Sequence, residues 1–161
     1  GDQEFLRLIE NLSSQNFSFK KGEANLRLLI SGKIDQPIAN GFLYLENGEI
    51  DFFDNSLKDI EASFIFDFDL VEVKNFNANG RESGSIAIEG SLPFYEKLYS
   101  ETQFLKFSSS NFRLKGNNLD LIVDSDMEIN GSFQNPNIKG NLAFNSGFIN
   151  LKNNKQKIKK K

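Results

Sequence analysis

Two stretches of the chain share one sequence pattern, called the phrase below, and this repeat decides the fold. Residues 129–151 read INGSFQNPNIKGNLAFNSGFINL, and residues 30–52 read ISGKIDQPIANGFLYLENGEIDF. They align without a gap at an offset of 99, with seven identities in 23 positions, and two of the three prolines fall in register. A shorter, partial copy of the pattern, IAIEGSL, occupies residues 86–92. A shared gapless register of this length predicts a repeated structural unit.

The phrase predicts a strand, a proline corner, a second strand, a tight turn and a third strand. A glycine between two apolar positions lets a strand bend and lets another backbone approach. Because proline has no N–H to donate, we expect the backbone to leave the hydrogen-bond ladder of the sheet at each proline. We expect it to rejoin the ladder at the following glycine. The turn after that is expected at Asn47-Gly48 and at Ser146-Gly147. The residues expected to form turns and corners are Gly32, Pro37, Gly41, Gly48, Gly90, Gly131, Pro136, Gly140 and Gly147.

Apolar and polar residues alternate over most of the chain from about residue 17. Phe64, Phe66 and Phe68 occupy even-numbered positions, and Asp67 and Asp69 occupy odd-numbered positions. Successive side chains of a strand point to opposite faces, so the pattern predicts an all-β, antiparallel sheet with one apolar face and one acidic, solvated face. Further turn signals stand at residues 79–80 and 115–118, and the second predicts a hairpin. The repeat favours an open sheet, because one unit cannot bury its own apolar face.

The chain divides into three segments. Residues 1–16 are a lead-in with a short amphipathic helix over 4–12, because Phe5, Leu8, Ile9 and Leu12 form one stripe. Residues 17–151 are the β segment, and residues 152–161 are a Lys-rich tail or linker. Six of the 19 basic residues lie in that tail, so the rest of the chain carries 13 basic and 22 acidic groups. An acidic body of this kind excludes nucleic acid as a partner.

Composition excludes several classes of site. The 161 residues contain no His and no Cys, which rules out a Cys/His zinc site, a thiol nucleophile and a histidine general base. No apolar run approaches the roughly 18 residues that cross a bilayer. The chain begins with Gly1, so we expect a fragment of a longer protein. No enzymatic activity and no cofactor are expected.

The repeated phrase resembles the TamB family, the translocation and assembly module proteins, grouped with AsmA-like and bridge-like lipid transfer proteins and including cyanobacterial and chloroplast relatives. The residues that carry the resemblance are 129–142 with 145–149, then 30–50, and 77–84 leading into 86–90. It covers roughly residues 20–151. It implies an elongated, U-shaped (taco-like) open β-groove with a hydrophobic lining, in a parent protein anchored in the inner membrane and crossing the periplasm. It also implies phospholipid transport, outer-membrane protein assembly and an outer-membrane β-barrel partner of the Omp85 type. The Lys-rich end departs from the family pattern.

The apolar residues at the alternating strand positions supply a candidate lining for phospholipid acyl chains. An acyl chain of 16 carbons in water faces a barrier on the order of 10 kcal/mol, which an apolar strip lowers without chemistry. An alternative is that these residues fill the core of a stand-alone sandwich or barrel that binds a protein partner or a small hydrophobic ligand. The candidate lining residues are Leu28, Ile30, Leu43, Leu45, Ile50, Phe52, Phe64, Phe66, Phe68, Ile86, Ile88, Leu121, Val123, Met127, Ile129, Leu142 and Phe144.

The remaining polar clusters favour solvated surface over chemistry. Asp124, Asp126 and Glu128 could collect Ca²⁺ along one side of a strand, but the glycine turn of an EF-hand loop is absent. Asp67 and Asp69 lack any sign of burial that would mark a hydrolase dyad. Residues 80–84 lack the Gly-Lys-Ser/Thr ending of a phosphate loop. We therefore expect no catalytic residue and no metal site.

Overall fold

The chain forms one sheet of eight strands in the computed structural model, which describes residues 17–33, 36–96 and 102–150. The described residues contain no α-helix. The helix expected over residues 4–12 and the Lys-rich tail lie outside the described residues. The strands are β1 (Phe17–Lys33), β2 (Gln36–Phe52), β3 (Asn55–Phe68), β4 (Leu70–Gly80), β5 (Ser85–Pro93), β6 (Leu105–Gly116), β7 (Leu119–Gly131) and β8 (Pro136–Ile149).

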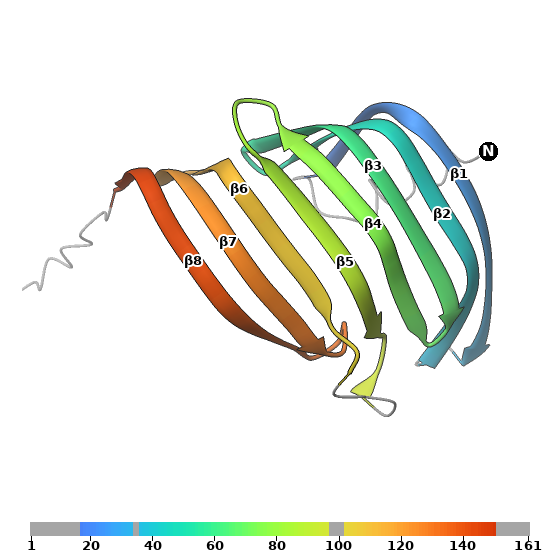
Figure 1. Cartoon of the computed structure of the whole chain (residues 1–161). Coiled ribbons are helices and arrows are strands. Elements are labelled where there is room, and N and C mark those ends of the chain that lie inside the picture. The colour runs from blue at the N-terminus through green and yellow to red at the C-terminus, as the bar shows by residue number, and fades with distance from the viewer. Residues whose placement is uncertain (1–16, 34–35, 97–101, 151–161) are drawn as a thin grey trace, which may run out of the picture.

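The strands lie in the sheet in the order in which they occur in the chain, and every neighbouring pair is antiparallel (Figure 1). Over the described residues β1 and β8 form the two edges and do not pair with each other. The predicted all-β, antiparallel class is therefore confirmed, and the sheet is open. It is neither a sandwich of two sheets nor a closed barrel.

Bulges interrupt several of the strands. Asn47 in β2, Asp59 in β3 and Asn111 in β6 have φ values of 51°, 52° and 46°, each at a shift of the pairing register. Asparagine and aspartate tolerate this left-handed region better than other non-glycine residues. The tight turns expected at Asn47-Gly48 and at Ser146-Gly147 are therefore wrong. β2 continues through the first to Phe52, where the extra residue becomes a bulge, and β8 continues through the second to Ile149.

The sequence repeat is also a structural repeat, because β1–β2 and β7–β8 have the same pairing register. Gly41 lies opposite Leu28, and Gly140 lies opposite Met127, which is the equivalent residue at the offset of 99. The two glycines have φ values of 147° and 151°. A side chain at Gly41 would collide with the carbonyl oxygen of Arg27, and one at Gly140 with that of Asp126, again the equivalent residue. Both sites thus require glycine for the same steric reason.

The proline corners of the two units are equivalent as well. Gly32 pairs with Pro37 where β1 meets β2, and Gly131 pairs with Pro136 where β7 meets β8. The sheet is therefore not left at the prolines as expected: Pro37 is the second residue of β2 and Pro136 is the first residue of β8, so each lies just after the connection. The glycines after them, Gly41 and Gly140, lie inside β2 and β8 and do not open a new strand.

Two apolar clusters form the core, and Phe64 and Phe76 pack against both. Ile60 in the first cluster and Leu92 in the second are each 1% exposed. Burying a side chain of this size contributes about 1.5–3 kcal/mol. The buried members of the first cluster are Leu57, Ile60, Ala62, Ala78, Phe112, Leu121 and Val123, and those of the second are Val73, Leu92 and Leu105.

Candidate functional site

Two rows of apolar residues and glycines cross the whole sheet on one face. Residues directly opposite each other on neighbouring strands point to the same face, so the pairing register identifies the members of each row. The first row is Leu26, Leu43, Phe64, Val73, Gly90, Leu105, Ile129 and Ile138. The second row is Ala24, Leu45, Ala62, Phe76, Ile88, Phe107, Met127 and Gly140. We call the side of the sheet that carries these rows the apolar face.

The register and the strand alternation place all seventeen candidate lining residues on the apolar face. They differ in accessibility. Leu121 and Val123 are buried in the first cluster, whereas the most exposed members lie on the edge strands or at strand ends. Those exposed members, at 47–62%, are Ile30, Phe52, Phe68, Leu142 and Phe144. That an acyl chain binds on this face stays a prediction.

Sequence reasoning missed the residues that form much of the core on this face. Leu57 and Ile60 are three residues apart, so the bulge at Asp59 breaks the alternation that would have revealed them. Val71 and Val73 alternate with Glu72 between them, so this pattern could have identified both valines, although the candidate lining omitted them. The omitted core residues are Leu57, Ile60, Val71, Val73, Phe76, Leu92, Leu105 and Phe112.

The opposite face carries charges of alternating sign. One row of paired positions there runs through Glu89, Lys106, Glu128 and Lys139 on β5 to β8. Lys139 forms an ion pair with Glu128 at 2.9 Å, with its side chain largely exposed to solvent. An exposed pair of this kind contributes well under about 1 kcal/mol. On β5 to β8 this row makes the opposite face charged, in contrast to the apolar face.

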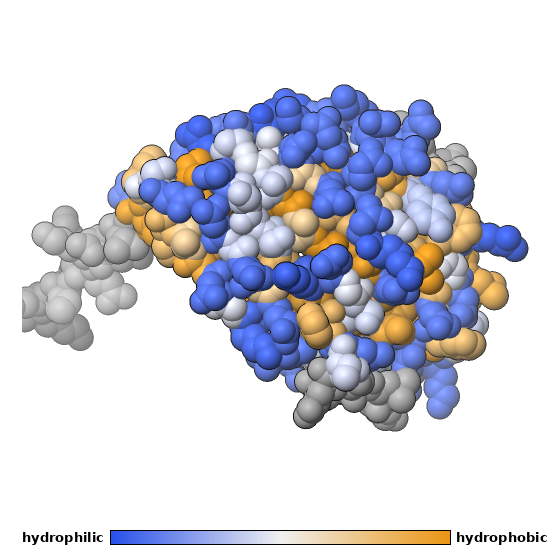
Figure 2. Space-filling model, in the orientation of Figure 1, coloured by the Kyte–Doolittle hydropathy of each residue, from blue (hydrophilic) through white to orange (hydrophobic). Residues whose placement is uncertain are grey.

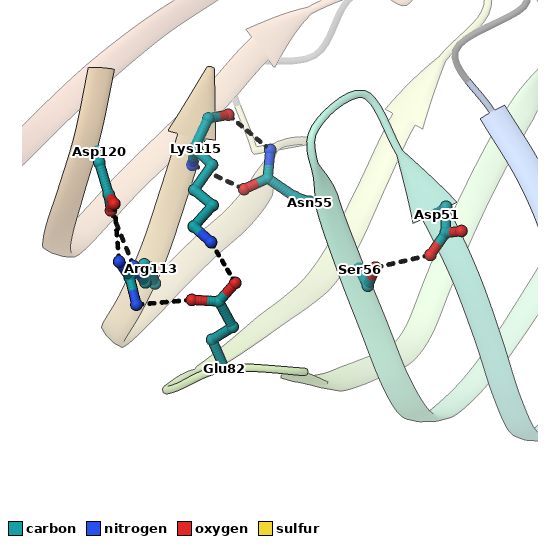
Figure 3. Close-up of polar contacts among 7 residues, drawn as sticks. All are labelled: Asp51, Asn55, Ser56, Glu82, Arg113, Lys115 and Asp120. Carbon is teal, nitrogen blue, oxygen red and sulfur yellow. Dashed lines mark hydrogen bonds and ion pairs between the residues drawn. The ribbon is translucent and has the colours of Figure 1, made fainter. Parts of the chain in front are cut away.

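A polar network ties together the strand ends that lie at the top of Figure 1 and is drawn in Figure 3. The Asn55 side chain donates to the Lys115 carbonyl at 3.0 Å and accepts from the Lys115 N–H at 2.8 Å, which links the start of β3 directly to β6. Arg113 donates to both carboxylate oxygens of Asp120 at 2.8 and 2.7 Å and pairs with Glu82 at 2.6 Å. Lys115 also pairs with Glu82. Hydrophilic side chains border the same end in Figure 2.

This network shifts the titration of its members. The hydrogen bonds from Arg113 hold the pKa of Asp120 below its usual value, and the hydrogen bond from Lys115 does the same for the pKa of Glu82. In return, Asp120 raises the pKa of Arg113. Charges that are neutralised within the network in this way act as a structural brace.

The carboxylates considered as a Ca²⁺ site have protein partners. Asp124 accepts from the Asn111 N–H at 2.6 Å and from the Asn145 side chain at 2.8 Å, and these bonds lower its pKa. Glu128 is paired with Lys139. Among the described residues no group of three or more acidic side chains is arranged to hold a metal ion. Asp124 therefore provides a hydrogen-bond acceptor for the backbone N–H of Asn111, which has left the strand ladder at the bulge.

Comparison with known proteins decides the family. The family model of the TamB C-terminal domain matches residues 74–160, more than half of the chain. The chain belongs to the TamB family. No curated protein and no solved structure shows significant similarity to it. The match begins within β4 and includes the second copy of the repeat.

TamB proteins are non-enzymatic transport and assembly modules associated with the cell envelope. Membership of the family makes this chain a TamB-like envelope protein segment. Over the described residues, the structure contains no helix with the length and apolar character needed to cross a membrane.

Proposed function

We propose that this TamB segment is a non-enzymatic conductor of phospholipid, with acyl chains lying along the apolar face and headgroups remaining at its wet border. The observation that carries the proposal is the pair of apolar rows that cross all eight strands of an unclosed sheet without a charged residue. Ala62, Val73 and Leu105 in these rows are buried in the core clusters, so a guest would contact the half-buried and exposed members of the rows. The lining is the set of seventeen residues named above.

The energetic case rests on the cost of hydrocarbon in water. Each exposed methylene costs about 0.8 kcal/mol, so an apolar path removes a barrier on the order of 10 kcal/mol for a 16-carbon chain. Eight strands spaced about 4.8 Å apart provide a path of roughly 34 Å, close to the thickness of a bilayer core. Transport between two membranes then requires further strands of the same kind beside this segment.

The wider role follows the family. We propose that the parent protein is anchored in the inner membrane, that this segment lies in the periplasm, and that it supports outer-membrane protein assembly with an Omp85-type barrel partner. The solvated face with alternating charges suits an aqueous compartment such as the periplasm.

The test compares two neighbouring, half-buried positions on opposite faces. A photoreactive p-benzoylphenylalanine replaces Phe66 on the apolar face or Ile65 on the other face, in the full chain expressed in a bacterial envelope. After irradiation, mass spectrometry should find several-fold more phospholipid adduct at position 66 than at position 65. A detergent-free preparation should also contain co-purified phospholipid. Equal adducts at the two positions, or a lipid-free protein, would contradict the proposal.

A further inference from the structure

Two serine hydroxyls interrupt the apolar face between β6 and β7. Ser109 and Ser125 lie directly opposite each other, and their Oγ atoms are 2.8 Å apart. The residues that pair with them on the outer sides are apolar, Ile86 on β5 and Leu142 on β8. The register places these two residues on the apolar face, so the hydroxyl pair lies on that face as well.

The repeat indicates that the fold does not require a hydroxyl here. At the offset of 99, Ser125 corresponds to Leu26. Leu26 pairs with Leu43 in the first unit. Ser125 pairs with the equivalent residue, Leu142, in the second unit. The same strand pair is thus built with leucine at this position, and a hydroxyl in apolar surroundings is unfavourable unless its hydrogen-bonding groups are used.

The two hydroxyls leave one donor unused. Together they offer two protons, and their mutual hydrogen bond uses one of them. Within the described part of the chain, neither oxygen has another hydrogen-bond partner. Ser125 is 9% exposed, whereas Ser109 is half-buried and is therefore the more accessible of the two. A usable donor results when Ser125 donates to Ser109 and the Ser109 proton points to a guest.

The hydroxyl pair lies where the filled core gives way to the accessible lining. Toward one end of the two strands follow Phe112 and Val123, which are buried in the first cluster. Toward the other end follow Phe107 and Met127, which are half-buried members of the second apolar row. Phe107 is two residues before Ser109, or about 6.6 Å along the strand. A hydrocarbon chain on the second row therefore lies beside the Ser109 hydroxyl.

A single donor on an apolar surface suits an acceptor without charge. Lys106, the nearest basic residue along β6, lies on the opposite face, so a phosphate or carboxylate at the hydroxyl pair would have no cation beside it. An ester carbonyl oxygen is uncharged and accepts a hydrogen bond. In a glycerophospholipid each acyl chain ends in such a carbonyl, directly next to the hydrocarbon.

We propose that the Ser109 hydroxyl donates a hydrogen bond to an ester carbonyl of the phospholipid. Ser125 is a positioning residue, because it donates to Ser109 and directs the remaining proton outward. This inference rests on the proposed lipid conduction and adds a selectivity to it. Phospholipids with ester-linked chains are held in preference to those with ether-linked chains, since an ether-linked chain has a methylene in place of the carbonyl and leaves the donor unpaired.

A competition between two lipids tests this selectivity. The photoreactive p-benzoylphenylalanine replaces Phe107 in the full chain, which is mixed with vesicles of equimolar dioleoylphosphatidylcholine and its analogue with two ether-linked oleyl chains. The two lipids share their headgroup and chain length and differ in the ester carbonyls. After irradiation, mass spectrometry should find about three- to tenfold more adduct of the ester lipid, which is the preference that one hydrogen bond provides.

Substitutions at the pair should change this adduct ratio. Ser109→Ala should lower the ratio to near one, and Ser109→Thr, which keeps the hydroxyl, should retain most of the preference. Ser125→Ala should give an intermediate ratio, because Ser109 keeps its proton and loses its partner. Ser108→Ala is the matched control, since Ser108 is half-buried on the same strand and lies on the opposite face. Circular dichroism checks that each variant folds.

The possible outcomes separate this inference from the proposed function. Capture of both lipids in equal amounts overturns the inference and leaves lipid conduction standing. A preference that survives Ser109→Ala, or that is lost in Ser108→Ala, has the same consequence. If neither lipid forms an adduct, lipid conduction along this face is contradicted and the inference is overturned with it.

Infrared spectroscopy provides a direct measurement of the hydrogen bond. Dioleoylphosphatidylcholine labelled with ¹³C at the ester carbonyls is bound to the wild-type chain and to Ser109→Ala. A hydrogen bond weakens the carbonyl bond, so the stretching frequency of the bound lipid should be lower with the wild-type chain than with the variant. Identical frequencies in the two samples overturn the inference.

Discussion

The two equivalent glycines provide a matched pair of perturbations in different surroundings. Gly41→Ala and Gly140→Ala each place a methyl group against the carbonyl oxygen of the equivalent residue on the preceding strand, at nearly the same backbone φ. The surroundings differ, because β2 lies between β1 and β3, whereas among the described strands β8 pairs with β7 alone. The same collision therefore meets a fixed backbone in one case and a movable one in the other.

The magnitudes follow from that difference. A residue forced into an unfavourable backbone region costs about 1–3 kcal/mol, and alanine returns about 0.4–1 kcal/mol by restricting the unfolded chain. At Gly41 both neighbouring strands resist a shift, so we expect a loss near the upper end, about 2 kcal/mol. At Gly140 the edge strand can move away from β7, so we expect a loss of about 1 kcal/mol or less.

The assay is urea unfolding followed by far-UV circular dichroism, since the chain contains no Trp. Each variant is measured at two protein concentrations, because association adds a concentration-dependent contribution to stability. Equal losses, or a larger loss at Gly140, would refute the argument that strand position controls the cost. A stability gain at either position would refute the steric reading of both glycines.

Three further perturbations test the core and the polar network. Ile60→Ala should lower the free energy of unfolding by about 2–5 kcal/mol in the same urea assay, because a fully buried side chain leaves a cavity; a loss below 1 kcal/mol would contradict that burial. Asn55→Ala removes both hydrogen bonds to the Lys115 backbone and should cost about 1–3 kcal/mol, and Asn55→Asp should not recover that loss, because a carboxylate oxygen would face the Lys115 carbonyl oxygen to which the amide donates. The lowered pKa of Asp120 contributes stability that is present at neutral pH and lost as the pH falls below about 4, so Asp120→Asn should flatten the acid limb of a stability–pH curve. Asp126→Asn on the same strand serves as the control, and an unchanged acid limb in Asp120→Asn would contradict the role of the Arg113 pair.

The sequence was sufficient to predict the strands and their apolar face, because both depend on local alternation. The side chains of Phe64, Phe66 and Phe68 follow the period of two, and the register confirms their common face. The gapless repeat likewise predicted that the two prolines have equivalent surroundings, and each lies at the start of a strand opposite the equivalent glycine.

What alternation could not predict depends on neighbours distant in sequence. Asn47-Gly48 is a good hairpin turn by composition, yet β1 and β3 both pair with this stretch of β2 and hold it extended as a bulge. The link between Asn55 and Lys115 joins residues sixty positions apart, and no local pattern marks either of them. Tertiary pairing overrides local turn preference in the first case and creates the contact in the second.

The left-handed residues at Asn47, Asp59 and Asn111 have a consequence for any guest of this sheet. Each adds one residue to one strand of a pair, so the bend belongs to the covalent backbone and exists before a guest arrives. A molecule that lies against the sheet spends none of its interaction energy on shaping the surface beneath it. Under the proposed lipid conduction, the curvature also remains after one lipid leaves, so the next lipid meets an unchanged surface.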